Sequence, residues 1–324
     1  MDSLCTFYVD NGEGWQIALT RVIDETAFNP KRRPLLIVPG YGMNSFIFGY
    51  HPNGPSMMDS LAAQGYEVWT ADFRTLGRAK RLWGTRRYRL EDIACTDLRL
   101  GIERILEVSE TSRDKVDLLG CSLGGTYLFI YLACGGEEAR ERIGAVVSMG
   151  SPLRWEKIHP ALRLAFGSPW LMRHVPMVGI RPLSAAVLPL LAKIPRVIGI
   201  YLHPDHVDIS RTDQFVRTVE DPNPVLNEEL ARWLKTRDLI IRGVNVTEAM
   251  HDVKIPVLTV IANADGIVPL ETAMSVHEHF GAEKKEVLRV GDSQAEFAHA
   301  DLFLSNLAQE RVFKPIGKWL AGVE

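Results

Sequence analysis

Gly120-Cys121-Ser122-Leu123-Gly124 is the stretch that most narrows the choice of fold. It follows an apolar run over 116–119 and precedes a helical pattern over 126–133, so it joins a buried strand to a helix. Gly-x-Ser-x-Gly at such a junction is typical of a nucleophile elbow, in which a strained serine projects its hydroxyl outward. The positions two before and two after that serine must be small, and both are glycine. The stretch therefore predicts a serine hydrolase with Ser122 as nucleophile.

Cys121 is a second candidate nucleophile, because a thiolate is intrinsically more reactive than a hydroxyl. If Cys121 occupied the elbow position, the two small positions would be Leu119 and Leu123, whose side chains are too large. We therefore interpret Cys121 as a small buried hydrophobic residue beside the site.

Composition excludes several classes of protein. The chain of 324 residues is long enough for one α/β core with an accessory segment, and its net charge of −3 gives no reason to expect a nucleic-acid partner. No secretion signal is visible at the start, and the apolar stretch over 182–192 is far shorter than the ~20 residues that cross a bilayer. The cysteines lie far apart without metal-ligand spacing, which predicts free thiols and a cytoplasmic location. They are Cys5, Cys95, Cys121 and Cys134.

Strand-like and helix-like patterns alternate along most of the chain. Residues 6–9 and 15–22 flank a Gly-rich turn and predict an antiparallel hairpin. Short apolar runs predict strands buried on both faces over 35–38, 67–72, 116–119, 145–149, 257–262 and 286–290. Helical patterns cover 56–64, 90–108, 126–133, 270–280 and 302–320. The alternation predicts a mostly parallel sheet with helices on both faces.

Residues 152–250 interrupt this alternation. Eight of the eighteen prolines lie between 152 and 204, so this part can form only short helices and bends. Its apolar content exceeds that of a solvated loop, which favours a helical lid over the carboxyl ends of the strands, where such sheets bind ligands. An independent helical domain is the alternative. We predict a core of residues 1–151 and 251–324 with a lid of residues 152–250.

Two further residues complete a catalytic triad with Ser122. A serine needs a general base, and the base needs a group that orients its ring. In this architecture the order along the chain is serine, acid, histidine. Asp265 lies in a polar turn after the predicted strand 257–262, and His299 follows the last predicted strand, directly before a helix. The alternatives are a turn-capping aspartate and a surface histidine. We predict Asp265 as the orienting acid and His299 as the base.

The oxyanion of the reaction needs backbone amide donors. One is normally the amide after the nucleophile, here Leu123, and the other comes from the loop after the first central parallel strand. That loop is Pro39-Gly40-Tyr41-Gly42-Met43, whose glycines allow close backbone approach. We predict Tyr41 as the second donor, with Met43 as the alternative. The alternative without a catalytic role is that this loop is an ordinary glycine-rich turn.

Several segments in order resemble the α/β-hydrolase superfamily, and the resemblance covers nearly all of the chain outside the lid. They are Val38 to Gly42, Asp72-Phe73-Arg74, Gly120 to Gly125, Pro256 to Pro269 and His299 to Phe303. Within the superfamily, the run 230–242, the double glycine after the elbow and the His299 segment resemble lipase-like hydrolases and polyhydroxyalkanoate synthases. Those synthases carry cysteine where this chain has Ser122, and the usual His-Gly of the oxyanion loop is Pro39-Gly40 here. The resemblance implies ester hydrolysis.

A run rich in basic residues follows the predicted strand 67–72. Between Arg74 and Arg89 there are seven basic residues and no acidic one. A solvated loop is one interpretation, and recognition of an anionic group such as the phosphates of an acyl-CoA or a lipid head group is the other.

The leading hypothesis is a serine carboxylic-ester hydrolase that acts through an acyl-enzyme on small-molecule esters with apolar acyl chains. It needs no cofactor and no metal ion. An acyltransferase or polyester-related enzyme with the same triad is the alternative, and a noncatalytic small-molecule receptor is a third. The sequence leaves the acyl chain length, the alcohol and the oligomeric state open.

Overall fold

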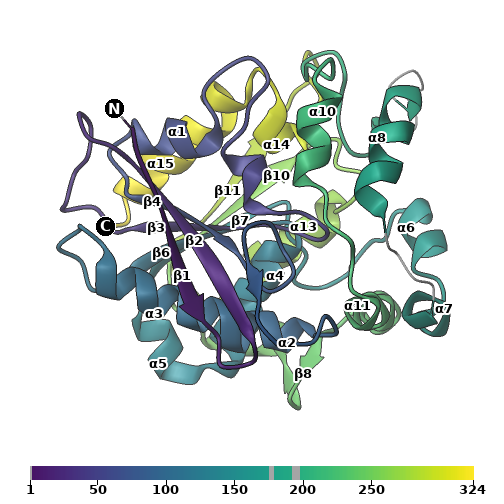
Figure 1. The fold of residues 1–324 in the computed structure, drawn as a ribbon, viewed down its shortest axis with the longest axis horizontal. Coiled ribbons are helices and arrows are strands. Elements are labelled where there is room, and N and C mark those ends of the chain that lie inside the picture. Colours follow the sequence, from purple (N-terminus) through teal and green to yellow (C-terminus); the bar gives the residue numbers. More distant parts are fainter. Residues whose placement is uncertain (1, 175–178, 192–197) are drawn as a thin grey trace.

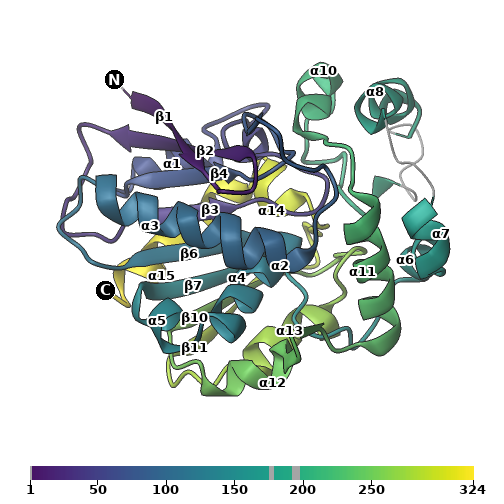
Figure 2. The ribbon, with the colours of Figure 1, turned by 60° about the horizontal axis from the view of Figure 1, so that its bottom comes forward.

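The computed structural model describes residues 2–174, 179–191 and 198–324. Within these residues, nine strands form one sheet in the order β1-β2-β4-β3-β6-β7-β10-β11, with β5 paired to β2. The strands from β4 to β11 along this path are parallel, whereas β1 and β2 run antiparallel to their neighbours. Figures 1 and 2 show this twisted sheet at the centre of the molecule. The predicted α/β-hydrolase fold with a mostly parallel sheet is confirmed.

The strand bounds follow the predicted apolar runs. The sheet contains β1 (Asp2–Asp10), β2 (Trp15–Asp24), β3 (Leu35–Val38), β4 (Val68–Asp72), β5 (Lys80–Arg81), β6 (Val116–Cys121), β7 (Ile143–Met149), β10 (Val257–Ala262) and β11 (Lys285–Val290). A separate small hairpin pairs β8 (Ile240–Ile241) with β9 (Val244–Asn245). Side chains alternate between two cores: Leu36 packs on one face of the sheet, and Leu35 on the other.

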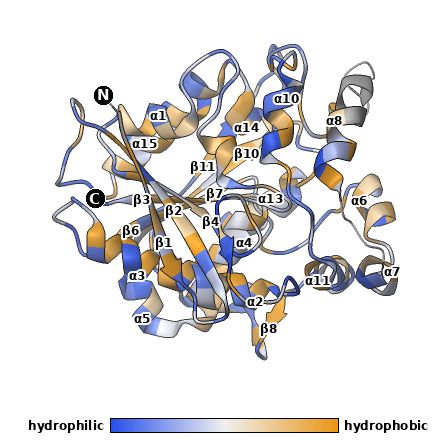
Figure 3. Cartoon of the chain, viewed as in Figure 1, coloured by the Kyte–Doolittle hydropathy of each residue, from blue (hydrophilic) through white to orange (hydrophobic). Residues whose placement is uncertain are grey.

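Helices cover both faces of the sheet. One face carries α2 (Leu90–Asp92), η2 (Ile93–Leu98), α3 (Arg99–Val108), α4 (Leu123–Cys134), α5 (Gly136–Glu141), α12 (Val246–Ala249), η4 (Met250–Asp252) and α13 (Leu270–His279). The other carries η1 (Ser45–Phe48), α1 (Met57–Ala62), α14 (Asp301–Leu304), η5 (Gln309–Phe313) and α15 (Lys314–Ala321). Figure 3 shows hydrophobic and hydrophilic residues side by side on these helices, as burial of one face requires. None of the described helices is long and apolar enough to cross a membrane.

A helical insertion lies between β7 and β10. Its described elements are α6 (Pro160–Ala165), α7 (Pro169–His174), α8 (Ile180–Leu191), α10 (Thr212–Phe215), η3 (Val216–Thr218) and α11 (Pro224–Thr236). In both views these helices stand together beside the sheet (Figures 1 and 2). The predicted helical insertion is therefore confirmed. Residues 175–178 and 192–197 of the predicted lid lie outside the described residues.

Two predicted helices are not continuous α-helices. The pattern over 90–108 divides into α2, the π-helical η2 and α3. The pattern over 302–320 breaks after α14, where Ser305 adopts an extended backbone with ψ of 140°. Its hydroxyl accepts the amide of Leu307 at 3.1 Å and contacts Nδ1 of His206 at 3.0 Å. A serine whose hydroxyl bonds a nearby backbone amide and a distant ring competes with helix continuation, which the helical periodicity could not reveal.

Candidate active site

Ser122 occupies a strained turn between β6 and α4. Its backbone has φ of 54° and ψ of −125°, outside the regions that residues with a Cβ normally adopt. The Ser122 amide donates to the carbonyl of Met149 on β7 at 2.9 Å, and its own carbonyl accepts the amide of Gly125 at 3.0 Å. These bonds hold the strained conformation in place. The geometry is that of a nucleophile elbow.

The glycines around the elbow are required by close backbone contacts. A Cβ on Gly124 would lie 2.2 Å from the carbonyl oxygen of Val38, and one on Gly120 would lie 2.3 Å from Cα of Gly125. A Cβ on Gly125 would meet the Ser151 hydroxyl at 2.2 Å, which accounts for the second glycine of the pair. The strand and helix therefore cross only because these positions carry no side chain.

His299 and Asp265 form a buried hydrogen-bonded pair. Nδ1 of His299 lies 2.7 Å from Oδ2 of Asp265, and the histidine is 3% exposed. The other oxygen of Asp265 accepts the amides of Ile267 and Val268, each at 2.8 Å. A carboxylate held in this way keeps the proton of the ring on Nδ1 and leaves Nε2 to act as an acceptor.

Gly150 leaves room for the side chains of His299 and Asp265, because it has no side chain of its own. This residue follows β7 with φ of +56°, and a Cβ there would lie 3.2 Å from Cε1 of His299 and 3.4 Å from Oδ2 of Asp265. The loop after β7 thus contributes no carboxylate to the site but allows the histidine and the aspartate to pack against it.

One apolar cavity of about 350 Å³ joins the predicted residues. Ser122 and His299 both line it, and Asp265 lies behind the histidine. Its wall also includes residues of the loop after β3, of η1, of the segment after β10, of α14 and of the insertion: Tyr41, Gly42, Met43, Ile47, Ser184, Tyr201, Leu202, Phe215, Val216, Thr218, Val219, Ile267 and Leu304. The cavity is therefore bounded by both the core and the helical insertion.

The predicted oxyanion donors lie on two sides of the nucleophile. Leu123 is the first residue of α4, where backbone amides have no acceptor within the helix and the helix dipole favours negative charge. Tyr41 lies in the loop after β3, and its hydroxyl donates to Oδ1 of Asn227 on α11 at 2.6 Å. Met43 forms a single β-bridge with Val219 of the insertion. The loop is thus tied to the insertion at two points.

Cys121 is buried in the core on the face opposite α4. Burial and the nearby Asp265 carboxylate both raise the pKa of its thiol, so the thiol stays protonated. A protonated and buried thiol is a poor nucleophile. The predicted role of Cys121 as a small core residue is confirmed.

Two supporting residues carried little or no signal in the sequence. Tyr201, in the insertion, lines the cavity with its ring centroid 6.2 Å from that of His299, and its carbonyl accepts the amide of Ala300 at 2.7 Å. Asp301 is fully buried and accepts the amides of Ala298 at 2.7 Å and His203 at 3.0 Å. Asp301 thus ties the residue before His299 to His203 of the insertion. Tyr201 lies in a segment without periodicity, so no pattern pointed to it.

The sheet, its covering helices and the serine on a strained strand-to-helix turn define an α/β-hydrolase. Residues 30–291 match the model of the family described as serine aminopeptidase, S33, and the chain belongs to that family. No curated protein sequence matches the chain significantly.

Solved structures of esterases and lipases share the fold at low sequence identity. A soluble variant of monoglyceride lipase from Saccharomyces cerevisiae is 16% identical with a TM-score of 0.67, and the match covers 100% of this chain and 95% of the lipase. An esterase from Rhodococcus sp. ECU1013 is 16% identical with a TM-score of 0.63, covering 100% and 99%. A putative aryl esterase from Burkholderia cenocepacia is 16% identical with a TM-score of 0.61, covering 98% and 99%.

Proposed function

We propose that this protein is a serine carboxylic-ester hydrolase that acts through an acyl-enzyme on small-molecule esters with apolar acyl chains. One observation carries the proposal: a serine on a strained elbow and a buried histidine–aspartate pair face one apolar cavity. Strain at a functional residue, a base with its orienting acid and a substrate-sized cavity are the elements that acyl transfer requires.

The mechanism follows from the positions of these groups. Oγ of Ser122 attacks the ester carbonyl while Nε2 of His299 takes its proton, and Asp265 stabilises the imidazolium. The amides of Leu123 and Tyr41 stabilise the oxyanion of the tetrahedral intermediate. His299 then gives the proton to the leaving alcohol, and the acyl group stays on Ser122. Water activated by His299 attacks the acyl-enzyme, releases the carboxylic acid and restores the serine.

The lining of the cavity favours an ester over a peptide. An aminopeptidase substrate carries an α-ammonium group, which a carboxylate normally binds. Among the described residues that line the cavity there is no Asp or Glu, and Phe215, Val216 and Val219 give it an apolar wall. Such a wall suits an acyl chain, because each buried methylene contributes up to ~0.8 kcal/mol.

The insertion is, in this proposal, the lid that shapes the acyl pocket. We assign residues 152–250 to the lid and residues 1–151 and 251–324 to the core, because lid and core residues line the same cavity. The resemblance to lipase-like hydrolases and polyhydroxyalkanoate synthases is consistent with acyl chemistry. Ser122 in place of cysteine favours hydrolysis over polymerisation. The four free cysteines support a cytoplasmic location.

A series of p-nitrophenyl esters from acetate to dodecanoate tests the substrate class. We expect kcat/KM to rise with chain length until the cavity is full, so that medium chains exceed acetate. A strict preference for acetate would mean that the insertion does not line the acyl site. Hydrolysis of aminoacyl anilides without ester turnover would identify a peptidase. Rapid transfer to an added alcohol or thiol in preference to water would identify an acyltransferase.

A further inference from the structure

The basic run after β4 is an ordered loop rather than a solvated one. We call residues 77–89 the basic loop. The amides of Leu82, Trp83 and Gly84 all donate to the carbonyl of Gly14, at 2.9, 3.2 and 2.9 Å. Gly84 is buried, and a Cβ there would lie 2.3 Å from the Trp15 ring. The turn before β2 therefore holds the tip of the loop in one conformation.

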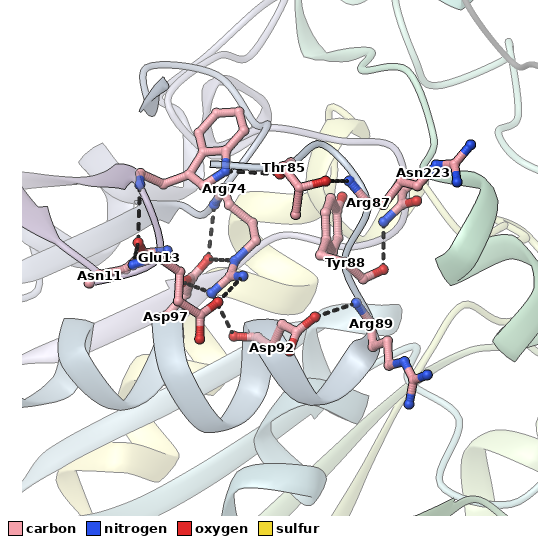
Figure 4. A network of polar contacts seen from close by, with 12 residues as sticks. Asn11, Glu13, Arg74, Thr85, Arg87, Tyr88, Arg89, Asp92, Asp97 and Asn223 are labelled. Carbon is pink, nitrogen blue, oxygen red and sulfur yellow. Dashed lines mark hydrogen bonds and ion pairs between the residues drawn. The ribbon is translucent and has the colours of Figure 1, made fainter. Parts of the chain in front are cut away.

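A polar network holds the base of the loop (Figure 4). Arg74 donates to Asp97 at 2.7 and 2.9 Å, and both side chains are buried. Nε1 of Trp15 donates to the carbonyl of Thr85 at 3.0 Å, and the side chain of Asn223 donates to the carbonyl of Tyr88 at 2.5 Å. Arg74 thus has a structural role, and we do not count it among the exposed basic residues of the run.

Gly84 of the loop is buried, whereas the large apolar side chains next to it are exposed. Leu82 is 52% exposed and Trp83 is 73% exposed, although the backbone of both is hydrogen-bonded. Exposed Trp and Leu at a fixed tip cost solvation free energy that the fold itself does not recover. A tryptophan in this position is typical of surfaces that meet an interface between water and an apolar phase.

The remaining six basic residues of the loop lack acidic partners. They are Arg78, Lys80, Arg81, Arg86, Arg87 and Arg89, and all six are exposed. Within the described part of the chain, none of them forms an ion pair with a carboxylate, whereas Arg99, Arg104 and Arg142 each pair with a glutamate. The loop therefore carries positive charge that no described carboxylate pairs, and the basic residues nearest to Trp83 along the chain are Lys80, Arg81, Arg86 and Arg87.

We propose that the basic loop docks this protein on an anionic lipid surface. Trp83 and Leu82 enter the interfacial region, and the surrounding Arg and Lys side chains contact the head-group phosphates. A nucleic acid would stack on the tryptophan but would gain little from the leucine. The loop follows β4, and Ser122 follows β6; both strands are parallel to β3, so the loop and Ser122 begin at the same carboxyl edge of the sheet, and docking would bring the site near apolar esters dissolved in the membrane.

Vesicle sedimentation with the full chain tests the proposal without any turnover, so its failure is independent of the proposed ester hydrolysis. We expect binding to vesicles with about one third phosphatidylglycerol, little binding to pure phosphatidylcholine, and weaker binding when ionic strength is raised about tenfold. Trp83→Ala and the double variant Arg86→Ser, Arg87→Ser should each weaken binding about tenfold. Hydrolysis of a water-soluble ester by both should match wild type.

Two matched controls should bind like wild type. Trp170→Ala removes another exposed tryptophan, on α7, and the double variant Lys235→Ser, Lys318→Ser removes two exposed charges elsewhere. Equal loss in Trp170→Ala would place the contact on the insertion and overturn the proposal. Equal binding to both kinds of vesicle, or to neither, would also overturn it. So would preferential binding of a single-stranded oligonucleotide that Trp83→Ala abolishes.

Discussion

The elbow and the helical insertion face the same cavity but are built differently. Ten of the twelve residues of α4 are buried, and Cβ atoms at the elbow glycines would overlap neighbouring backbone. Helices α6 and α7 have no buried residue, and Leu164 and Trp170 are largely exposed. The candidate catalytic residues are thus held by a close-packed frame, whereas the insertion that supplies part of the wall also carries helices with no buried residue. Substitutions in the frame should change turnover, and substitutions in the insertion should change substrate preference.

The frame should be most sensitive at the histidine–aspartate pair. Asp265→Asn is expected to lower kcat by about 1,000- to 10,000-fold, because an amide favours the wrong imidazole tautomer. Steady-state hydrolysis of p-nitrophenyl butyrate measures the loss, and circular dichroism checks that the variant folds. Asp114→Asn removes an exposed carboxylate and should keep full activity. Full activity of Asp265→Asn would mean that another acid serves His299.

The packing of the elbow predicts a smaller effect on stability. A Cβ on Gly124 would lie 2.2 Å from the carbonyl oxygen of Val38, so Gly124→Ala must displace backbone and should lower the free energy of unfolding by about 1–3 kcal/mol. In Gly54→Ala the nearest atom would be 3.5 Å away, and stability should hardly change. Urea denaturation compares the two. Equal midpoints would contradict the close packing ascribed to the elbow.

The insertion should control chain-length preference. Phe215 is buried and lines the cavity, so Phe215→Ala is expected to lower kcat/KM for decanoate roughly fivefold to tenfold. Turnover of acetate, whose acyl group buries little apolar surface, should stay near wild type and serves as an internal control. A uniform loss over all chain lengths would indicate that Phe215 supports the frame instead.

The smallest effect is expected at Glu229 on α11, which connects the insertion to the core through Leu90. Its carboxylate accepts the amide of Leu90 at 2.9 Å, and burial raises its pKa to about 7. The folded state therefore binds more protons than the unfolded state from about pH 4.5 to 7, and wild-type stability falls as pH rises through this window. Glu229→Gln cannot ionise. It should match wild type at pH 5 and exceed it by about 1 kcal/mol at pH 8, allowing for solvent screening.

Thermal unfolding at the two pH values measures the effect of Glu229→Gln. Glu137→Gln, at an exposed site on α5, should show no such pH-dependent gain. The same difference at both pH values would mean that ionisation of Glu229 does not matter for this connection.

The sequence predicted best those parts of the fold whose burial is uniform. β3 and β10 have the predicted bounds because strands buried on both faces are continuous apolar runs. Ser305, at the break, contacts the distant His206, and Asp97, in the π-helical segment over 93–98, bonds the distant Asn11 and Arg74; no local pattern contains these partners. Both departures from a regular α-helix thus coincide with tertiary contacts.

In the candidate site, too, residues placed by the strand pattern could be predicted from the sequence, and residues placed by distant contacts could not. Ser122, Asp265 and His299 each lie in a segment that follows a parallel strand, so the topology brings them to one edge of the sheet. Tyr201 comes from the insertion, where irregular short helices give no periodicity from which to place a side chain. Gly150 carries no signal in the sequence, because only the structure shows the histidine packed against it.

Labelling with a fluorophosphonate probe tests the central claim most directly. The wild-type protein should react stoichiometrically, with the adduct located on Ser122 by mass spectrometry. Ser122→Ala should neither label nor turn over esters, because the covalent step has no substitute nucleophile, whereas Cys121→Ala should retain most of both activities. Labelling that persists in Ser122→Ala, or that disappears in Cys121→Ala, would contradict the assignment of the elbow.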